Sequence, residues 1–322
     1  MIKKALSAIA FLVALVFCGA ACADDYPSKP IRLIVPFSPG TAVDLVGRLL
    51  SVPLSEALKT PVIIENRIGA ASQIGAQLVA KAKPDGYTLL FTSPAHYING
   101  LLYTTLPYDP IKDFSPIARM SDSLVVLVVS KSSPVNSVKE LIEYARARAG
   151  KLNYSSAGNG STTHLPAAMF NSLAGLDIVH VPYKSGAQAL TDVIGNQVFM
   201  TFTAPATALS HVKAGTLKAI AVTGPYRSAS MPDVPTIAEA GVPGYEFLSW
   251  NALLAPAGTP EAIITRLETT LLEISKSPEF KAKVLAGGAE PKPMSRSAFM
   301  DRLKEEIPMW EKMIAISGAK PE

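Results

Sequence analysis

The chain has 322 residues, of which 48% are hydrophobic and 17% are charged, and its formal net charge at pH 7 is +4. Lysine and arginine residues are scattered along it, which excludes the basic stripe that nucleic-acid-binding proteins carry. A chain of this length can bury a core that is stable without disulfides.

The first 23 residues are predicted to form an export signal. Lys3 and Lys4 give a positively charged start, residues 5–21 are apolar, and Ala21-Cys22-Ala23 provides the small residues of a cleavage site. A membrane anchor is disfavoured because the apolar stretch is short, and lipidation at Cys22 ranks below plain secretion. Cleavage at this site would remove both cysteines of the chain and leave a soluble periplasmic protein.

From residue 24 onward, short apolar strands alternate with amphipathic helices. Strands are predicted at 31–35, 61–65, 87–92, 124–130, 152–155, 177–181, 198–203, 217–223 and 247–255. Helices are predicted at 42–58, 73–81, 137–147, 163–173, 186–195 and 205–214, with a long helical region from residue 260. The alternation predicts an α/β protein with largely parallel sheets, and the length predicts two of them.

Two strand–loop–helix junctions carry the strongest functional signal. In the first, the strand Ile31–Val35 leads through 36–40 into a helix; in the second, 155–163 separate a short strand from a helix that starts near His164. Such a junction aims backbone N–H groups and the positive end of a helix dipole at one point, and so holds an anion without cationic side chains. Either junction alone is equally well explained as an ordinary turn. Together they predict two lobes that close on a carboxylate or a similar anion.

The candidate ligand-binding residues come from these junctions and from strand ends predicted to face the same cleft. Gly158 and Gly160 permit a positive φ and close approach of a ligand, and His164 is either a neutral donor to the ligand or bonded to a local carbonyl. The full set is Ser38, Gly40, Thr41, Ala42, Val43, Asp44, Ser93, Ser156, Gly158, Asn159, Gly160, Ser161, Thr162, His164, Tyr183, Thr203, Ala204 and Trp250.

Asp44 has two interpretations. A carboxylate in the first turn of a helix most often caps the helix or complements its dipole. Alternatively, Asp44 accepts hydrogen bonds from loop amides and so shapes the anion site, or meets an ammonium group on the ligand. Arg48, one turn further along, is a candidate partner that would neutralise it.

Seven segments in a fixed order span nearly the whole chain after the export signal: 26–37, 65–70, 83–90, 106–109, 152–160, 180–184 and 253–260. They closely resemble successive signatures of the tripartite tricarboxylate transporter substrate-receptor family, also called Bug proteins. The resemblance implies an α/β, two-lobed periplasmic-binding-protein (Venus flytrap) fold with two hinge crossings. The apolar strands at 124–130 and 247–255 are the predicted crossings. Residues 24–124 with 250–322 would form one lobe and residues 125–249 the other.

The first junction departs from the family pattern. The family commonly has glycine where this chain has Thr41, and threonine where it has Val43. Val43 therefore either makes the pocket floor more tolerant of an apolar ligand, or simply faces the core at helical spacing with Val46 and Leu50.

The resemblance implies a receptor that captures a small carboxylate and delivers it to a transient partner, the membrane transporter. The alternative is an orphan receptor that presents its ligand to a sensor. Candidate ligands are di- or tricarboxylates, acidic amino acids and aromatic carboxylates. A monomer without cofactor or metal is expected. An enzyme is disfavoured because hydrolase, nucleotide-binding and zinc motifs are absent from the sequence, and a Ser161–His164 pair lacks an orienting acid.

Overall fold

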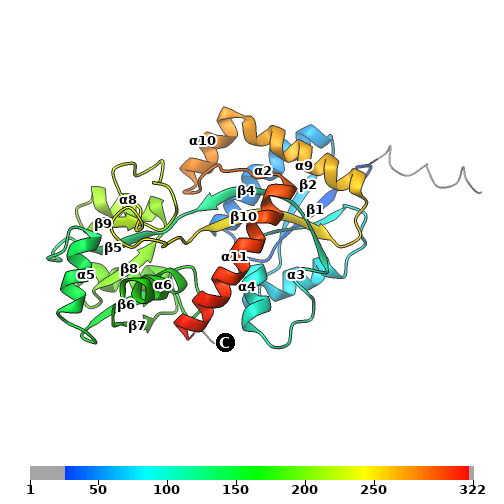
Figure 1. The fold of residues 1–322 in the computed structure, drawn as a ribbon. Coiled ribbons are helices and arrows are strands. Elements are labelled where there is room, and N and C mark those ends of the chain that lie inside the picture. The colour runs from blue at the N-terminus through cyan, green and yellow to red at the C-terminus, as the bar shows by residue number, and fades with distance from the viewer. Residues whose placement is uncertain (1–25, 319–322) are drawn as a thin grey trace, which may run out of the picture.

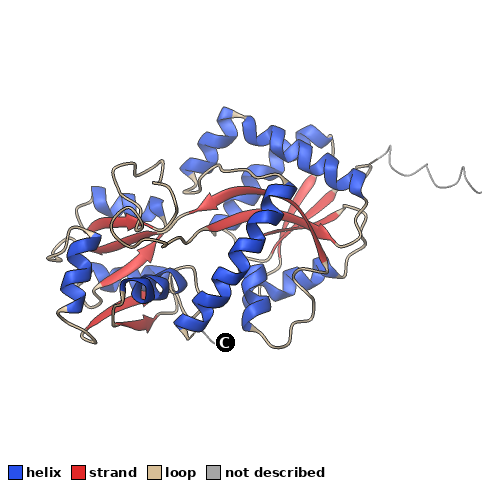
Figure 2. Cartoon of the chain, viewed as in Figure 1, coloured by secondary structure: helices blue, strands red, loops and turns tan. Residues whose placement is uncertain are grey.

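The computed structural model describes residues 26–318, which form two neighbouring lobes, each built on one five-stranded sheet with flanking helices (Figure 1, Figure 2). The predicted export signal lies outside the described residues. Within residues 26–318, no helix combines the length and the hydrophobicity that a membrane crossing requires.

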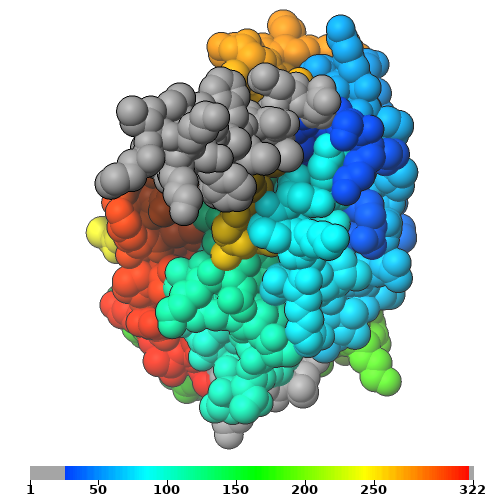
Figure 3. Space-filling view, turned by 90° about the vertical axis from the view of Figure 1, so that its right-hand side faces the viewer, coloured from blue at the N-terminus to red at the C-terminus, as the bar shows by residue number. Residues whose placement is uncertain are grey.

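The first lobe contains the sheet β2-β1-β3-β10-β4. Strand β1 (Ile31–Val35) pairs in parallel with β2 (Val62–Asn66) and β3 (Thr88–Thr92), whereas β10 (Ser249–Pro256) runs antiparallel to β3 and to β4 (Phe114–Ser123). Its helices are α2 (Ala42–Leu58), the short 3₁₀ turn η1 (Ala70–Ser72), α3 (Gln73–Ala80), α4 (Ala95–Leu102), α9 (Glu261–Lys276) and α10 (Pro278–Ala286). Segments from both ends of the sequence therefore share this lobe, as the end-on view shows (Figure 3).

The second lobe contains the sheet β7-β6-β8-β5-β9. Strand β6 (Leu152–Ser156) pairs in parallel with β7 (Ile178–Pro182) and β8 (Met200–Thr203), whereas β5 (Val126–Ser130) runs antiparallel to β8 and to β9 (Leu217–Val222). Its helices are α5 (Val138–Arg146), α6 (Leu165–Ala174), α7 (Gly186–Ile194) and α8 (Pro205–Lys213).

The prediction of largely parallel sheets is wrong in one respect, because each sheet is mixed and has one strand opposed to its neighbours. That strand is β10 in the first sheet and β5 in the second. The chain reaches each of these two strands from the other lobe. The strand therefore starts at the end of its sheet that faces the other lobe and runs away from that lobe, whereas the other strands of the sheet run toward it. The carboxyl ends of β1, β3, β6 and β8 consequently all face the gap between the lobes.

Local sequence explains why β1 and α2 have the predicted bounds. Strand β1 is almost entirely buried, as its apolar run requires. Thr41 caps the start of α2, since its side chain accepts a hydrogen bond from the Asp44 amide, and Lys59 caps the end of the helix in the left-handed conformation. Sequence patterns do not reveal β4 or α4, because β4 alternates apolar residues with Ser, Pro, Arg and Asp and α4 is only two turns long.

The C-terminal helix α11 (Arg296–Ser317) lies across both lobes (Figure 1). It packs on α4 and β4 of the first lobe and on α6 of the second. In its first turn, the ring of Phe299 lies edge-on to that of Trp250, with 4.9 Å between ring centroids. Because α11 contacts both lobes, the assignment of all residues after 250 to the first lobe stays a prediction.

A buried ionic cluster joins α11 to the two strands next to the crossings. The carboxylate of Glu306 on α11 accepts hydrogen bonds from Trp250 Nε1 on β10 (2.8 Å), from Arg119 Nη1 on β4 (3.1 Å) and from Arg302 Nε (3.1 Å). Arg119 is fully buried and also pairs with Asp122. The buried charge of Arg119 is compensated by the two carboxylates of Asp122 and Glu306, since an unpaired charge in the same place would be strongly unfavourable.

Replacement of Glu306 by alanine should therefore lower the free energy of unfolding by about 3–5 kcal/mol, because it leaves the buried indole N–H of Trp250 without its acceptor and removes one of the two carboxylates that pair with buried Arg119. Chemical denaturation measures this loss. The control is Glu305→Ala, which removes an exposed carboxylate that pairs with the same Arg302 and should cost less than about 1 kcal/mol. Equal losses in the two variants would contradict a structural role for the buried cluster.

Candidate ligand-binding site

A cavity of about 270 Å³ lies where the two lobes face each other. The first lobe contributes the loop after β1, the turn η1 and one face of α4. The second lobe contributes the loop after β6 and the start of α6, and the segment entering β10 completes the wall. The lining residues are Phe37, Ala71, Ser72, Pro94, Ala95, Ile98, Asn99, Leu102, Tyr103, Asn159, Gly160, Ser161, Thr162, Leu165, Phe247 and Ser249.

The first junction is held by its own side chains. Gly40 has a φ of +84°, and its amide donates to Asp44 Oδ2 at 2.9 Å. The Thr41 hydroxyl donates to the Ser38 carbonyl at 2.8 Å and caps α2. Asp44 therefore shapes the loop by accepting a hydrogen bond from a loop amide, as one of its two interpretations predicts. The N-cap residue of α2 is Thr41.

The second junction repeats this arrangement. Gly160 has a φ of +70°, and its amide donates to Nδ1 of His164, four residues further along, at 3.0 Å. The Ser161 side chain accepts from the His164 amide at 3.2 Å. In both lobes, a glycine amide thus binds the side chain at the start of the next helix, and the residue after the glycine provides a hydroxyl acceptor.

This shared arrangement determines which loop amides a ligand can use. The amides of Gly40 and Gly160 are occupied within the protein. Among the described residues, no acceptor is bonded to the amides of Asn159, Thr162 and Thr163, which belong to the second loop. These N–H groups lie in the loop just before α6 and its N-cap residue His164.

The turn η1 is a part of the site that the sequence did not indicate. Ala70, Ala71 and Ser72 have φ values of +45°, +48° and +78°, a left-handed conformation that is unfavourable for residues with a side chain. The side-chain amide of Asn99 holds the turn by donating to the Ala71 carbonyl at 2.7 Å. Strained backbone of this kind gathers at ligand sites. The only signal in the sequence is the run of small residues after Gly69.

The predicted site residues divide into three groups. Those that line the cavity are Asn159, Gly160, Ser161 and Thr162. Those in exposed parts of the first loop or at strand ends, outside the lining, are Ser38, Gly40, Thr41, Ala42, Thr203, Ala204 and Tyr183. Those buried beneath the loops are Val43, Asp44, Ser93, Ser156, His164 and Trp250. Gly158 lies between, half-buried in the second loop with a φ of +110°.

Two predicted residues belong to the core instead of the cleft. Trp250 is fully buried and donates to Glu306, because β10 turns this side chain toward α11. Val43 is 9% exposed and packs in the core cluster that includes Val46 and Leu50, so the interpretation from helical spacing is confirmed. Tyr183 also points elsewhere, since its hydroxyl donates to Asp192 Oδ2 at 2.6 Å.

Asp44 is the electrostatic centre of the first loop. Arg48 makes a two-pronged hydrogen bond to it at 2.9 and 3.0 Å, and Asn66 Nδ2 donates to it at 2.7 Å. Burial by itself would raise the pKa of Asp44, but the hydrogen bonds from Arg48, Asn66 and Gly40 outweigh it and hold the pKa below the usual value. Arg48 is thereby committed to Asp44 and does not line the cavity.

His164 lies beneath the second loop in a stack of rings. Its imidazole is parallel to that of His180, with 4.0 Å between centroids, and Tyr154 continues the stack. Burial, together with the neighbouring His180, lowers the pKa of His164 to about 4. The ring is therefore neutral at pH 7, which its acceptor role toward the Gly160 amide requires.

The histidines do not form a hydrolytic site. Ser156 Oγ lies 2.6 Å from His180 Nε2, but Ser156 is fully buried and its hydroxyl is also bonded to Gly158. Nδ1 of His164 is occupied by the Gly160 amide, so it is not available to activate Ser161. Within residues 26–318, no group of three or more His, Cys, Asp or Glu side chains is placed to hold a metal ion.

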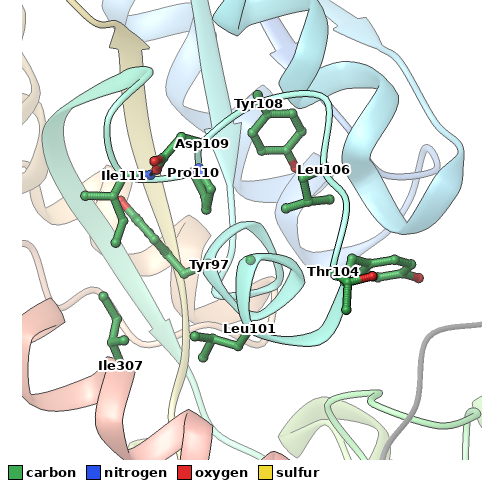
Figure 4. Close-up of a pocket in the computed structure, with 11 residues that line it drawn as sticks. Tyr97, Leu101, Thr104, Leu106, Tyr108, Asp109, Pro110, Ile111 and Ile307 are labelled. Atoms are coloured by element: carbon green, nitrogen blue, oxygen red, sulfur yellow. Dashed lines mark hydrogen bonds between the residues drawn. The ribbon is translucent and has the colours of Figure 1, made fainter.

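A second cavity, of about 340 Å³, lies on the other side of α4. Tyr97 points from α4 toward Ile111, and Ile307 approaches from α11 (Figure 4). All its lining residues come from the first lobe and α11. Because closure of the lobes would not enclose a ligand there, the cavity between the lobes is the better candidate site.

Comparison with known proteins identifies the class. The family model described as "Tripartite tricarboxylate transporter family receptor" matches residues 46–318, so the chain belongs to this family of solute-binding receptors. Three solved structures resemble it. An R. palustris protein solved with adipate is 38% identical, with a TM-score of 0.79, and covers 92% of this chain and 100% of its own.

The periplasmic binding protein BugD is 31% identical with a TM-score of 0.75, and covers 92% of this chain and 100% of its own. MatC from Rhodopseudomonas palustris, solved with bound malate, is 30% identical with a TM-score of 0.73, and covers 90% and 100%. The predicted family and two-lobed α/β fold are confirmed. These relatives are binding proteins, which agrees with the expectation of a receptor instead of an enzyme.

Replacement of Val43 by threonine should lower the free energy of unfolding by about 1–2 kcal/mol, because it places a hydroxyl in the apolar core. The ranking of carboxylate ligands should stay as it is. Urea denaturation and calorimetric titration measure the two effects. The same replacement at Val52, which is 60% exposed on the same helix, is the control and should be close to neutral. An altered ligand ranking with unchanged stability would contradict the core position of Val43 and indicate that this residue contacts the ligand.

The stability of the protein should fall as the pH is lowered from 6.5 toward 4. In this interval unfolded His164, with its ordinary pKa of 6.5, binds a proton that the folded form, with a pKa of about 4, does not bind. The variant His164→Asn keeps an acceptor for the Gly160 amide but does not titrate, so its loss of stability should be smaller. Urea denaturation at several pH values measures the slope, and identical slopes would contradict this role of His164.

Proposed function

We propose that this protein is a periplasmic receptor that captures a small carboxylate between its two lobes and delivers it to a tripartite membrane transporter. The observation that carries the proposal is the cavity to which both lobes and the segment entering β10 contribute lining residues. A ligand bound there touches both lobes at once, so it stabilises the closed arrangement more than the open one.

The chemistry of the cavity supports an anionic ligand held by neutral donors. No lysine or arginine is among the lining residues. The amides of Asn159, Thr162 and Thr163 are unbonded in the loop before α6, near the end of the helix whose dipole favours negative charge. Neutral hydrogen bonds are less costly to desolvate than a buried ion pair, and they release the ligand more readily.

The two connections between the sheets support a hinge. Strand β4 leads into β5 through two residues, and the second connection returns through Phe247 to β10. The buried cluster around Glu306 fixes β4 and β10 relative to each other on the first-lobe side. Bending is therefore expected beyond this cluster, at Leu124–Val125 and near Phe247–Leu248.

Binding is tested by thermal shift and calorimetric titration with adipate, malate and benzoate. An acid present at 100 times its dissociation constant should stabilise the fold by about 2.7 kcal/mol. Gly158→Val should weaken binding by about tenfold or more, because valine resists the φ of +110° that the loop requires. The control is Gly175→Val, at a φ of +60° on the far end of α6, which should bind normally. Failure of every acid to bind would overturn the proposal.

Delivery is tested separately in the organism that encodes the chain. Deletion of the gene should abolish uptake of the acid identified by titration, and the Gly158→Val protein should restore uptake less well than the Gly175→Val protein. Uptake that is unaffected by the deletion would exclude the transport role even if binding were demonstrated.

A further inference from the structure

We infer that His180 on β7, together with Ser156 at the end of β6, positions the second loop for carboxylate binding. Neither side chain lines the cavity, so both act through the backbone of Gly158. This inference rests on the proposed function and names two positioning residues of the same site. It depends on a chain of hydrogen bonds that runs from β7 to the loop, and on the stacking of two imidazole rings beneath the loop.

The second loop contains both available and bound backbone amides. Those of Asn159, Thr162 and Thr163 have no acceptor within residues 26–318. Those of Gly158 and Gly160, on either side of Asn159, donate to side chains of the protein. A glycine without such a bond has wide conformational freedom. The side chains that hold the two glycines therefore determine the direction in which the amide of Asn159 points.

Gly158 is held by Ser156. Its amide donates to Ser156 Oγ at 3.2 Å, and the Ser156 hydroxyl donates to the Gly158 carbonyl at 3.1 Å. Nε2 of His180 lies 2.6 Å from the same Oγ. A hydroxyl has one hydrogen to donate, and Ser156 uses it on Gly158, so His180 Nε2 is the donor in the third bond. His180 therefore carries its hydrogen on Nε2, and its bond holds the Ser156 hydroxyl against Gly158.

The other glycine is connected to the same histidine by ring stacking. Gly160 donates to Nδ1 of His164, and the His164 ring lies parallel to that of His180 with 4.0 Å between centroids. Tyr154, the partner of His180 in the pairing of β6 with β7, also stacks on it at 4.9 Å. His180 thus bonds to the residue that holds Gly158 and packs on the residue that holds Gly160. One side chain on β7 supports both glycines of the loop.

Two variants separate this positioning role from the general stability of the fold. His180→Phe keeps a ring against His164 but removes the donor to Ser156, and Ser156→Ala removes the hydroxyl that holds Gly158. The probe is whichever of adipate, malate and benzoate binds the unaltered protein most tightly in calorimetric titration. Each variant should bind it about fivefold or more weakly, which corresponds to the loss of one net hydrogen bond. The double variant should lose no more affinity than either single variant, because both changes interrupt the same chain of bonds.

A conservative variant and a matched control complete the titration. His180→Gln can still donate to Ser156 through its side-chain amide, so it should retain more affinity than His180→Phe. The control is Ser155→Ala. Ser155 is as fully buried as Ser156, but it points to the other face of β6 and donates to the Ala189 carbonyl at 3.1 Å. Its replacement should lower stability in urea denaturation and leave the affinity unchanged. Full affinity in His180→Phe, or additive losses in the double variant, would overturn the inference and leave the receptor function standing.

Nuclear magnetic resonance tests the inference without a ligand. The Gly158 amide should exchange its hydrogen with solvent about tenfold or more faster in His180→Phe and in Ser156→Ala than in the unaltered protein or in Ser155→Ala. The ring nitrogen shifts of His180 should show its hydrogen on Nε2. Unchanged exchange in His180→Phe, or a hydrogen on Nδ1 of His180, would contradict the positioning role. If the exchange changed as expected but none of the three acids bound, the proposed function would fail and the positioning of the loop would stand.

Discussion

The direction in which β5 and β10 enter their sheets determines most of what surrounds the cleft. Each of these strands comes from the other lobe, starts at the edge nearest to it and runs away. Their neighbours run the opposite way and end at the cleft. The loops after β1, β3 and β6 are thereby brought together between the lobes, although they are far apart in the sequence. Ligand sites in open α/β sheets form at such carboxyl ends of strands.

The same connections explain the buried cluster at Glu306. Strands β4 and β10 are adjacent in the first sheet, and each continues into a connection to the other lobe. Arg119 on β4 and Trp250 on β10 both bind Glu306 on α11, so one carboxylate joins both connections to a helix that also packs on α6. Buried ionic groups contribute little net stability but strongly penalise alternative arrangements. This agrees with the proposed hinge, in which the two connections bend beyond the cluster.

The two strand–loop–helix junctions show how similar backbone geometry is obtained from different side chains. An ionised aspartate at position 44 and a neutral histidine at position 164 accept the same kind of glycine amide. The buried charge of Asp44 is compensated by Arg48 and Asn66. His164 carries no charge that needs a partner, because burial and its stacking on His180 keep its ring neutral. The second loop is therefore held without an ionised carboxylate, which agrees with the proposed binding of an anion there.

The sequence alone determined the elements with strong periodicity, the junction loops and the family, because apolar spacing, glycine positions and ordered motifs are local properties. It identified Asn159 to Thr162, which line the cavity. It placed Trp250 in the cleft and left Val43 undecided, since the side of β10 or α2 that meets the core depends on packing against distant segments. The turn η1 and the cavity-lining face of α4 were decided only by tertiary structure: α4 is too short to show a clear period, and a left-handed turn of Ala-Ala-Ser forms only because Asn99, far along the chain, holds it.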